Sequence, residues 1–176
     1  MAHSDDTIGT WLERILDHEG GFTDDPHDPG NWTGGEIGSG MLKGTKWGVA
    51  ANSWPELDIP NLTRDEAVAI YRQNYLNPLE ADRYSDGVAF QLLDLAINSG
   101  VWRAKTLLQR AVGAKEDGII GPITLGKLYA FSESDLIMLI IATRLDYLTN
   151  LNAWPRFSRG WVRRIATNLR YGVLDS

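Results

Sequence analysis

The most constraining feature of this 176-residue chain is the segment from Asp86 to Ser99, which is apolar on nearly every side of the helix it would form. A helix that is hydrophobic all round must be buried, because it has no polar face to turn toward water. The segment therefore predicts a central helix that other helices enclose. A chain of this length is long enough to bury such a core within about one domain.

Amphipathic helical patterns flank this segment. Apolar residues recur at three- and four-residue steps over residues 7–18, and Thr63-Arg64-Asp65-Glu66 forms a capping box that predicts a helix start. Further helices are expected at residues 104–112, 122–128, 134–148 and 159–169. No alternating run predicts a long strand. The sequence therefore predicts an all-α (mainly α) fold.

Residues 22–54 interrupt the helical pattern with Gly, Pro, Asp, Asn and Thr. Long irregular segments inside compact domains are usually functional or mobile. The Gly-rich stretch from Gly34 to Gly44 has the composition of tight turns, which is compatible with a small β-hairpin. We therefore expect an irregular lobe near the N-terminus, with a small β-hairpin at most.

Composition and charge exclude several classes of function. The chain has no Cys, which excludes disulfides, thiol nucleophiles and cysteine metal sites. Its net charge of −6 argues against a nucleic-acid binder. The three histidines do not form an H-E-x-x-H helix, so we expect no metal and no cofactor. The start of the chain lacks the pattern of a signal peptide, and we expect synthesis in the cytoplasm.

The sequence His18-Glu19-Gly20-Gly21-Phe22 places a carboxylate at the end of the first predicted helix. Two glycines beside Glu19 would let a ligand come close to the backbone. An apolar wall would raise the pKa of the Glu19 carboxyl, as a general acid near neutral pH requires. The alternative is an ordinary helix end with Gly as its cap.

A second candidate carboxylate, Asp28, lies nine residues beyond Glu19 in a loop that two prolines stiffen. Glycoside hydrolysis needs an acid for the leaving oxygen and a second group that stabilises the cationic centre, attacks it or orients water. The alternative is an Asx-turn loop whose carboxylates bind only backbone amides. The spacing of oxygen ligands in an EF-hand is missing.

These motifs together resemble glycoside hydrolase family 108, the lysozyme-like muramidases of bacteriophages and prophages. Phe22 stands in place of the family's Tyr, and Asn31 in place of its second Gly. The resemblance continues through the predicted central helix and a turn similar to the family's peptidoglycan-binding half. The matching stretches are Glu19-Gly20-Gly21, Asp25-Pro26, Asp28-Pro29-Gly30, Thr45, Gly48-Val49, Phe90–Gly100 and Asp117–Thr124.

The resemblance implies a lysozyme-like helical fold and cleavage of the β-1,4 bond between N-acetylmuramic acid and N-acetylglucosamine. Glu19 would be the general acid, while Asp28 and Thr45 would address the anomeric centre and its water. An insertion before Thr45 leaves Thr33 as an alternative. Residues 1–100 would form the catalytic region and residues 101–176 a helical peptidoglycan-binding region, packed as one compact domain. Whether the reaction retains or inverts the anomeric configuration stays open.

Three further side chains are candidates for substrate binding. The rings of Phe22 and Trp47 could stack on sugars, and core packing is the alternative for each. The Asn98 amide could bond an N-acetyl group, or it could help to end its helix. One turn earlier, Asp94 needs a partner inside so apolar a helix, and we expect a structural ion pair there.

The family resemblance also implies partners and a setting. We expect a monomeric phage endolysin that acts on peptidoglycan in the periplasm after holin release. The last predicted helix is rich in arginine, which could give weak contact with an outer-membrane or membrane surface. The alternative is a helix docked on the core with a solvated face. These arginines are Arg156, Arg159, Arg163, Arg164 and Arg170.

Two other functions fit the same motifs. A lytic transglycosylase would use Glu19 without an obligatory second carboxylate, and it would leave anhydromuramic ends. A non-catalytic wall-binding or secretion-assisting protein would bind sacculi without cleaving them. A peptidase or amidase would need a zinc ion or a thiol, for which the sequence offers no ligands.

Overall fold

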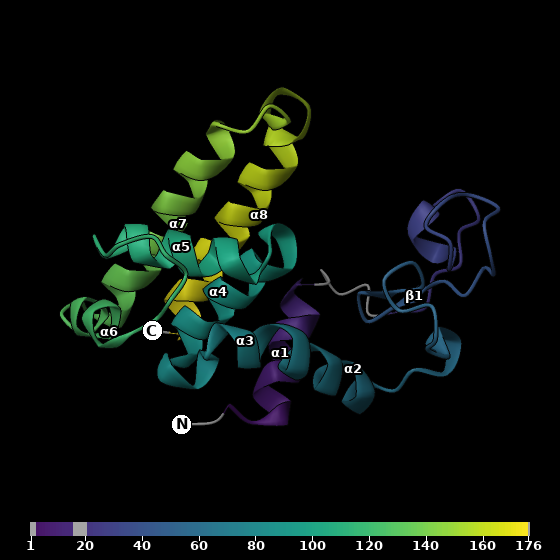
Figure 1. Ribbon diagram of the computed structural model, residues 1–176, viewed down its shortest axis with the longest axis horizontal. Helices are drawn as coiled ribbons and strands as arrows, with labels where there is room; N and C mark the ends of the chain where they lie inside the picture. The colour runs from purple at the N-terminus through teal and green to yellow at the C-terminus, as the bar shows by residue number, and fades with distance from the viewer. Residues whose placement is uncertain (1–2, 16–20, 176) are drawn as a thin grey trace. The chain divides into compact units, whose positions relative to one another are not determined.

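The computed structural model describes residues 3–15 and 21–175 of the chain (Figure 1). The described residues form two compact units, His3–Gln73 and the part from Asn74 onward, which we call the N-terminal and C-terminal units. The mainly α fold class is confirmed. The functional division at residue 100 stays a prediction. The helices on either side of residue 100 both belong to the C-terminal unit.

Two helices pack together in the N-terminal unit. Helix α1 (Asp5–Ile15) buries an apolar face against α2 (Arg64–Tyr71). The predicted capping box starts α2, because Thr63 Oγ1 accepts from the Glu66 amide and the Glu66 carboxylate accepts from the Thr63 amide. The end of the helix predicted over residues 7–18 lies outside the described residues. The chain continues from α2 through a π-helical turn, Arg72–Leu76.

The irregular lobe between these helices is held by short pieces of structure. Strands β1 (Thr45–Lys46) and β2 (Val49–Ala50) form an antiparallel hairpin, with Thr45 opposite Ala50. A small hairpin in this lobe was expected and is confirmed, but it lies just after the Gly34–Gly44 stretch that suggested it. Two single-turn 3-10 helices, Pro29–Asn31 and Ile59–Asn61, complete the lobe.

The C-terminal unit is built around α4 (Asp86–Ser99), which is buried along most of its length. Its neighbours include α5 (Val101–Ala111), α7 (Glu133–Thr149) and α8 (Trp154–Asp175). Figure 1 shows α7 and α8 side by side. The remaining segments are α3 (Asn77–Leu79), α6 (Pro122–Leu128) and the 3-10 turn Ala81–Arg83. The central helix predicted from its apolar character is confirmed.

The last helix is longer than the range predicted from the sequence, 159–169, because it begins at Trp154 and runs to Asp175. The helix begins before Pro155, because a proline in the first turn of a helix has no intrahelical N–H bond to lose. Gly160 did not break it either. Trp161 and Ile165 lie on its inner side, so tertiary packing offsets the low helix propensity of glycine.

Asp94 is buried in the centre of this unit, with 1% of its side chain exposed. Its Oδ2 accepts from Arg144 and from Asn168 Nδ2, and its Oδ1 accepts from Arg164. Burial raises the pKa of the Asp94 carboxyl, but the guanidinium groups of Arg144 and Arg164 outweigh burial and hold that pKa below its ordinary value. The expected structural ion pair is confirmed, and it joins α4, α7 and α8.

Candidate active site

Asn31 is the buried centre of the loop that carries the predicted site residues, with no exposed surface. Its Oδ1 accepts from the Thr45 hydroxyl at 2.7 Å, and its Nδ2 donates to the Asp25 carbonyl at 3.0 Å. Its own carbonyl accepts from the amides of Lys43 and Gly44. The hydrogen bonds of Asn31 therefore hold the loop that carries Asp28 against the start of β1.

Asp28 lies at the start of the 3-10 turn Pro29–Asn31 and is exposed. Its Oδ1 accepts from the Gly30 amide at 2.8 Å, which caps the turn. Its Oδ2 accepts no hydrogen bond from the part of the chain that the structure describes. One carboxylate oxygen thus fixes the orientation of the side chain while the other faces solvent. Asp28 combines the capping role of an Asx turn with a free oxygen for chemistry.

Thr45 is half-buried and pairs with the segment that follows the predicted acid. The amides and carbonyls of Thr23 and Thr45 exchange two hydrogen bonds of 2.9 and 2.8 Å. Thr23 is four residues beyond Glu19 in the chain. Glu19 itself, the predicted general acid, lies outside the described residues.

Thr33, the alternative to Thr45, has a different environment. Its Oγ1 accepts from the Met41 amide at 2.9 Å, inside a turn closed by a bridge between Trp32 and Leu42. The hydroxyl of Thr33 thus bonds the backbone of its own turn. Thr45, by contrast, directly contacts Asn31 and its bridge partner Thr23.

The two aromatic candidates flank β1. Phe22 lies against Gly44 and has 42% of its surface exposed. Trp47 has the positive φ of 52°, which it adopts in the tight turn between β1 and β2. The Tyr71 hydroxyl donates to the Trp47 carbonyl at 3.2 Å and ties this turn to α2. Phe22 therefore offers an exposed ring, and Trp47 a half-buried one.

Asn98, the third binding candidate, belongs to the C-terminal unit. Its Nδ2 donates to the Asp94 carbonyl at 2.6 Å, one turn back in α4. It also lines a pocket of about 140 Å³ together with the aromatic side chains Tyr147 and Trp161 and the cations Arg144 and Arg164. Asn98 thus combines a bond within its own helix with a place in a polar and aromatic pocket.

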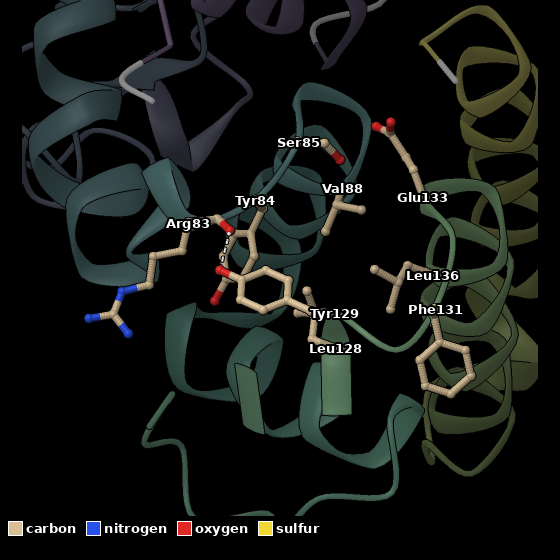
Figure 2. Close-up of a pocket in the computed structure, with 9 residues that line it drawn as sticks. All are labelled: Arg83, Tyr84, Ser85, Val88, Leu128, Tyr129, Phe131, Glu133 and Leu136. Carbon is tan, nitrogen blue, oxygen red and sulfur yellow. Dashed lines mark hydrogen bonds between the residues drawn. The ribbon is translucent and has the colours of Figure 1, made fainter. Parts of the chain in front are cut away.

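A second pocket, of about 230 Å³, lies between the start of α4, the end of α6 and the start of α7 (Figure 2). The Glu133 carboxylate accepts from the Gly87 amide, and its negative charge stabilises the N-terminal end of α4, where the helix dipole is positive. The Tyr129 hydroxyl donates to the Arg83 carbonyl at 3.4 Å. Burial raises the pKa of the Tyr84 hydroxyl. No residue predicted for catalysis or substrate binding lines this pocket.

Sequence reasoning missed the role of Asn31. The signal was present, because Asn31 stands where the related family has a glycine. A side-chain amide at this position supplies a donor and an acceptor that glycine lacks.

Two absences hold for residues 3–15 and 21–175. Nowhere in these ranges do three His, Asp or Glu side chains gather as metal ligands. None of the helices there is both long and apolar enough to cross a bilayer.

The comparisons with known proteins agree with the motifs. The family model described as glycosyl hydrolase 108 matches residues 12–100, half of the chain. The chain belongs to glycosyl hydrolase family 108. It is therefore a glycoside hydrolase, and membership of glycosyl hydrolase family 108 makes peptidoglycan its substrate. The matched range contains all six predicted site residues of this family member: Glu19, Phe22, Asp28, Thr45, Trp47 and Asn98.

A solved structure is similar over almost the whole chain. This structure, titled "Structure of Brucella abortus SagA", has 29% sequence identity and a TM-score of 0.75. The similarity covers 98% of this chain and 97% of that chain. No curated protein sequence matches this family 108 chain.

Proposed function

We propose that this family 108 hydrolase is a phage-type endolysin that cleaves the β-1,4 bond between N-acetylmuramic acid and N-acetylglucosamine. Glu19 donates a proton to the leaving 4-oxygen, and water supplies the oxygen that replaces it at the anomeric carbon. Asp28 stabilises or attacks the developing cation, or it positions the water together with Thr45. The observation that carries this proposal is the link from the Asp28 turn through Asn31 to the Thr45 hydroxyl.

The arrangement of the loop supports these roles. The capping bond from Gly30 restrains Asp28, so the carboxylate loses little rotamer freedom when substrate binds. The Thr45 hydroxyl donates to Asn31, which leaves the lone pairs of its oxygen free to accept a hydrogen bond from water. The pairing of Thr23 with Thr45 holds the segment around Thr23 beside Thr45.

The test compares purified Gram-negative sacculi treated with the wild type, Glu19→Gln and Asp28→Asn. We expect clearing by the wild type with reducing muramic acid ends, and loss of clearing in Glu19→Gln with binding to sacculi retained. The amide oxygen that Asp28→Asn introduces can still accept from Gly30, so this substitution removes the charge and keeps the cap. Asp25→Asn is the matched control, because Asp25 Oδ1 accepts from the His27 amide in the same loop.

The products decide between the alternatives. Anhydromuramic ends would replace the proposed hydrolysis by a lytic transglycosylase reaction. Binding of sacculi without cleavage by the wild type would instead support a wall-binding or secretion-assisting role. The anomeric configuration of the first-formed product would show whether Asp28 attacks the cation or positions water.

The proposed setting is phage lysis, with synthesis in the host cytoplasm and release to the wall by a holin. This setting rests on the family resemblance. We expect that cells expressing the protein lyse only when their inner membrane is permeabilised. Lysis without permeabilisation would contradict holin-dependent release.

A further inference from the structure

Four of the five arginines in α8 point away from the protein. Arg156, Arg159, Arg163 and Arg170 are all exposed. Their spacings of three, four and seven residues place them on one face of the helix. The fifth, Arg164, turns inward to Asp94. The four outward arginines, which we call the arginine stripe, span about 21 Å of helix at 1.5 Å per residue.

The arginine stripe has no charge partner in the parts of the chain that the structure describes. From Trp154 to Leu174 the helix contains no Asp or Glu. Elsewhere in the same unit, exposed cations pair with carboxylates, as Arg83 does with Glu80 and Arg110 with Glu116. A protein with a net charge of −6 thus presents a continuous positive face on one helix.

An exposed apolar strip runs beside the arginine stripe. Val162, the half-buried Ala166, Leu169 and Val173 follow one another at spacings of four, three and four residues. The exposed fractions of Val162, Leu169 and Val173 are 45%, 43% and 77%. Val173 is mostly exposed, and Val162 and Leu169 each expose nearly half of their surface.

The opposite face of α8 accounts for the packing of the helix. Ile165 and Asn168 are buried there, and the Asn168 carbonyl accepts from Gln91 of α4. Gly172 lies so close to α7 that an added Cβ would be 2.8 Å from the Ile137 side chain. The inner face alone docks the helix, so the outer face is free to serve another contact.

We propose that the outer face of α8 docks on an anionic lipid bilayer surface. The arginine stripe would pair with lipid phosphates, and the apolar strip would enter the boundary between headgroups and acyl chains. Arginine suits this position because its aliphatic stem can lie along apolar surface while its guanidinium reaches phosphate. A soluble polyanion would use only the arginines, which is why the apolar strip favours a bilayer. This contact is independent of the hydrolytic reaction.

The experiment measures co-sedimentation with vesicles of phosphatidylglycerol and phosphatidylethanolamine. A quadruple variant, Arg156→Gln/Arg159→Gln/Arg163→Gln/Arg170→Gln, is compared with Arg83→Gln/Arg110→Gln/Lys115→Gln/Lys127→Gln, which removes the same charge elsewhere in the unit. Each arginine near an anionic surface contributes about fivefold in affinity at moderate salt. We expect a loss of at least a hundredfold in the first variant and less than tenfold in the second.

A second pair of measurements separates a bilayer from a soluble polyanion. Val162→Ser/Leu169→Ser/Val173→Ser should weaken binding to the vesicles and leave binding to inorganic polyphosphate unchanged. Binding of the wild type should also weaken as salt rises from about 50 to about 500 mM, since salt screens exposed charges. Circular dichroism melting confirms that each variant is folded. If a variant is not folded, the salt dependence of wild-type binding still tests the role of charge.

Three outcomes would overturn the proposal. If the wild type binds phosphatidylcholine vesicles as tightly as the anionic vesicles, charge does not drive the contact. Equal vesicle binding by both quadruple variants would remove the role of the arginine stripe. Tight polyphosphate binding with unchanged vesicle binding in the serine variant would assign the face to a soluble polyanion instead.

Discussion

The hydroxyl of Thr45 donates to the side-chain oxygen of Asn31 at 2.7 Å, and this bond joins two segments that lie fourteen residues apart in the chain. Asn31 has no exposed surface, so neither water nor another side chain can readily replace it. The bond orients the Thr45 hydroxyl and leaves its oxygen free to accept. Stability of the loop and geometry of the candidate site therefore depend on the same amide.

Asn31→Ala should lower the free energy of unfolding by about 2–4 kcal/mol, because it leaves the Thr45 hydroxyl and the Asp25 carbonyl without partners. Asn31→Asp should cost at least as much, because it buries an unpaired charge and sets a carboxylate oxygen against the Asp25 carbonyl. Denaturant unfolding followed by circular dichroism measures both. Asn52→Ala, at an exposed position, should change stability by less than about 0.5 kcal/mol.

Thr45→Val should lower kcat on sacculi at least tenfold, because valine keeps the shape of threonine and removes the hydroxyl that would position water. Thr45→Ser should retain most activity. Thr33→Val should cost about 1 kcal/mol of stability through the unpaired Met41 amide and leave kcat unchanged. Turbidity kinetics at saturating substrate measure each variant. The opposite result, with kcat lost only in Thr33→Val, would move the role to Thr33.

Gly44→Ala should destabilise the protein more than Gly38→Ala does. Both glycines have nearly the same φ, +80° and +79°, so both substitutions carry the same backbone strain of about 1–2 kcal/mol. A Cβ at Gly44 would lie 2.5 Å from the Phe22 ring and the Thr23 carbonyl, whereas Gly38 has open space around it. We expect an additional cost of about 1–3 kcal/mol at Gly44, together with loss of activity. Equal effects in thermal melts would show that Phe22 and Thr23 move aside freely.

Local signals in the sequence predicted most of the helices. The central helix follows from its apolar character, and α2 follows from the Thr63–Glu66 capping box, because each depends on neighbouring residues alone. The departure from the family's glycine marked Asn31, but the sequence does not show which groups its side chain bonds, because Asp25 and Thr45 lie six and fourteen residues away in the chain. The early start of α8 was missed because a proline in the first turn does not weaken a helix, and because tertiary packing offsets the low helix propensity of Gly160. The role of Glu19 stays a prediction.

Asp94→Asn should lower the free energy of unfolding by about 3–5 kcal/mol at pH 7, because it leaves Arg144 and Arg164 without the carboxylate that pairs them. The same carboxylate makes stability depend on pH. Its pKa is lower in the folded protein than the ordinary value of about 3.9 in an unfolded chain. The contribution of Asp94 is therefore complete above about pH 5 and is lost as the pH falls through the folded pKa.

The difference in stability between the wild type and Asp94→Asn should consequently shrink as the pH falls from about 5 to about 2. Denaturant unfolding at several pH values measures that difference directly. Asp146→Asn is the control on the neighbouring helix α7, because it removes an exposed carboxylate by the same chemical change. Its difference from the wild type should stay small and nearly constant. If the difference in stability between the wild type and Asp94→Asn is constant across this range, the Asp94 carboxyl has the same pKa in the folded and unfolded protein. That result would contradict the pairing of Asp94 with two guanidinium groups in the folded protein.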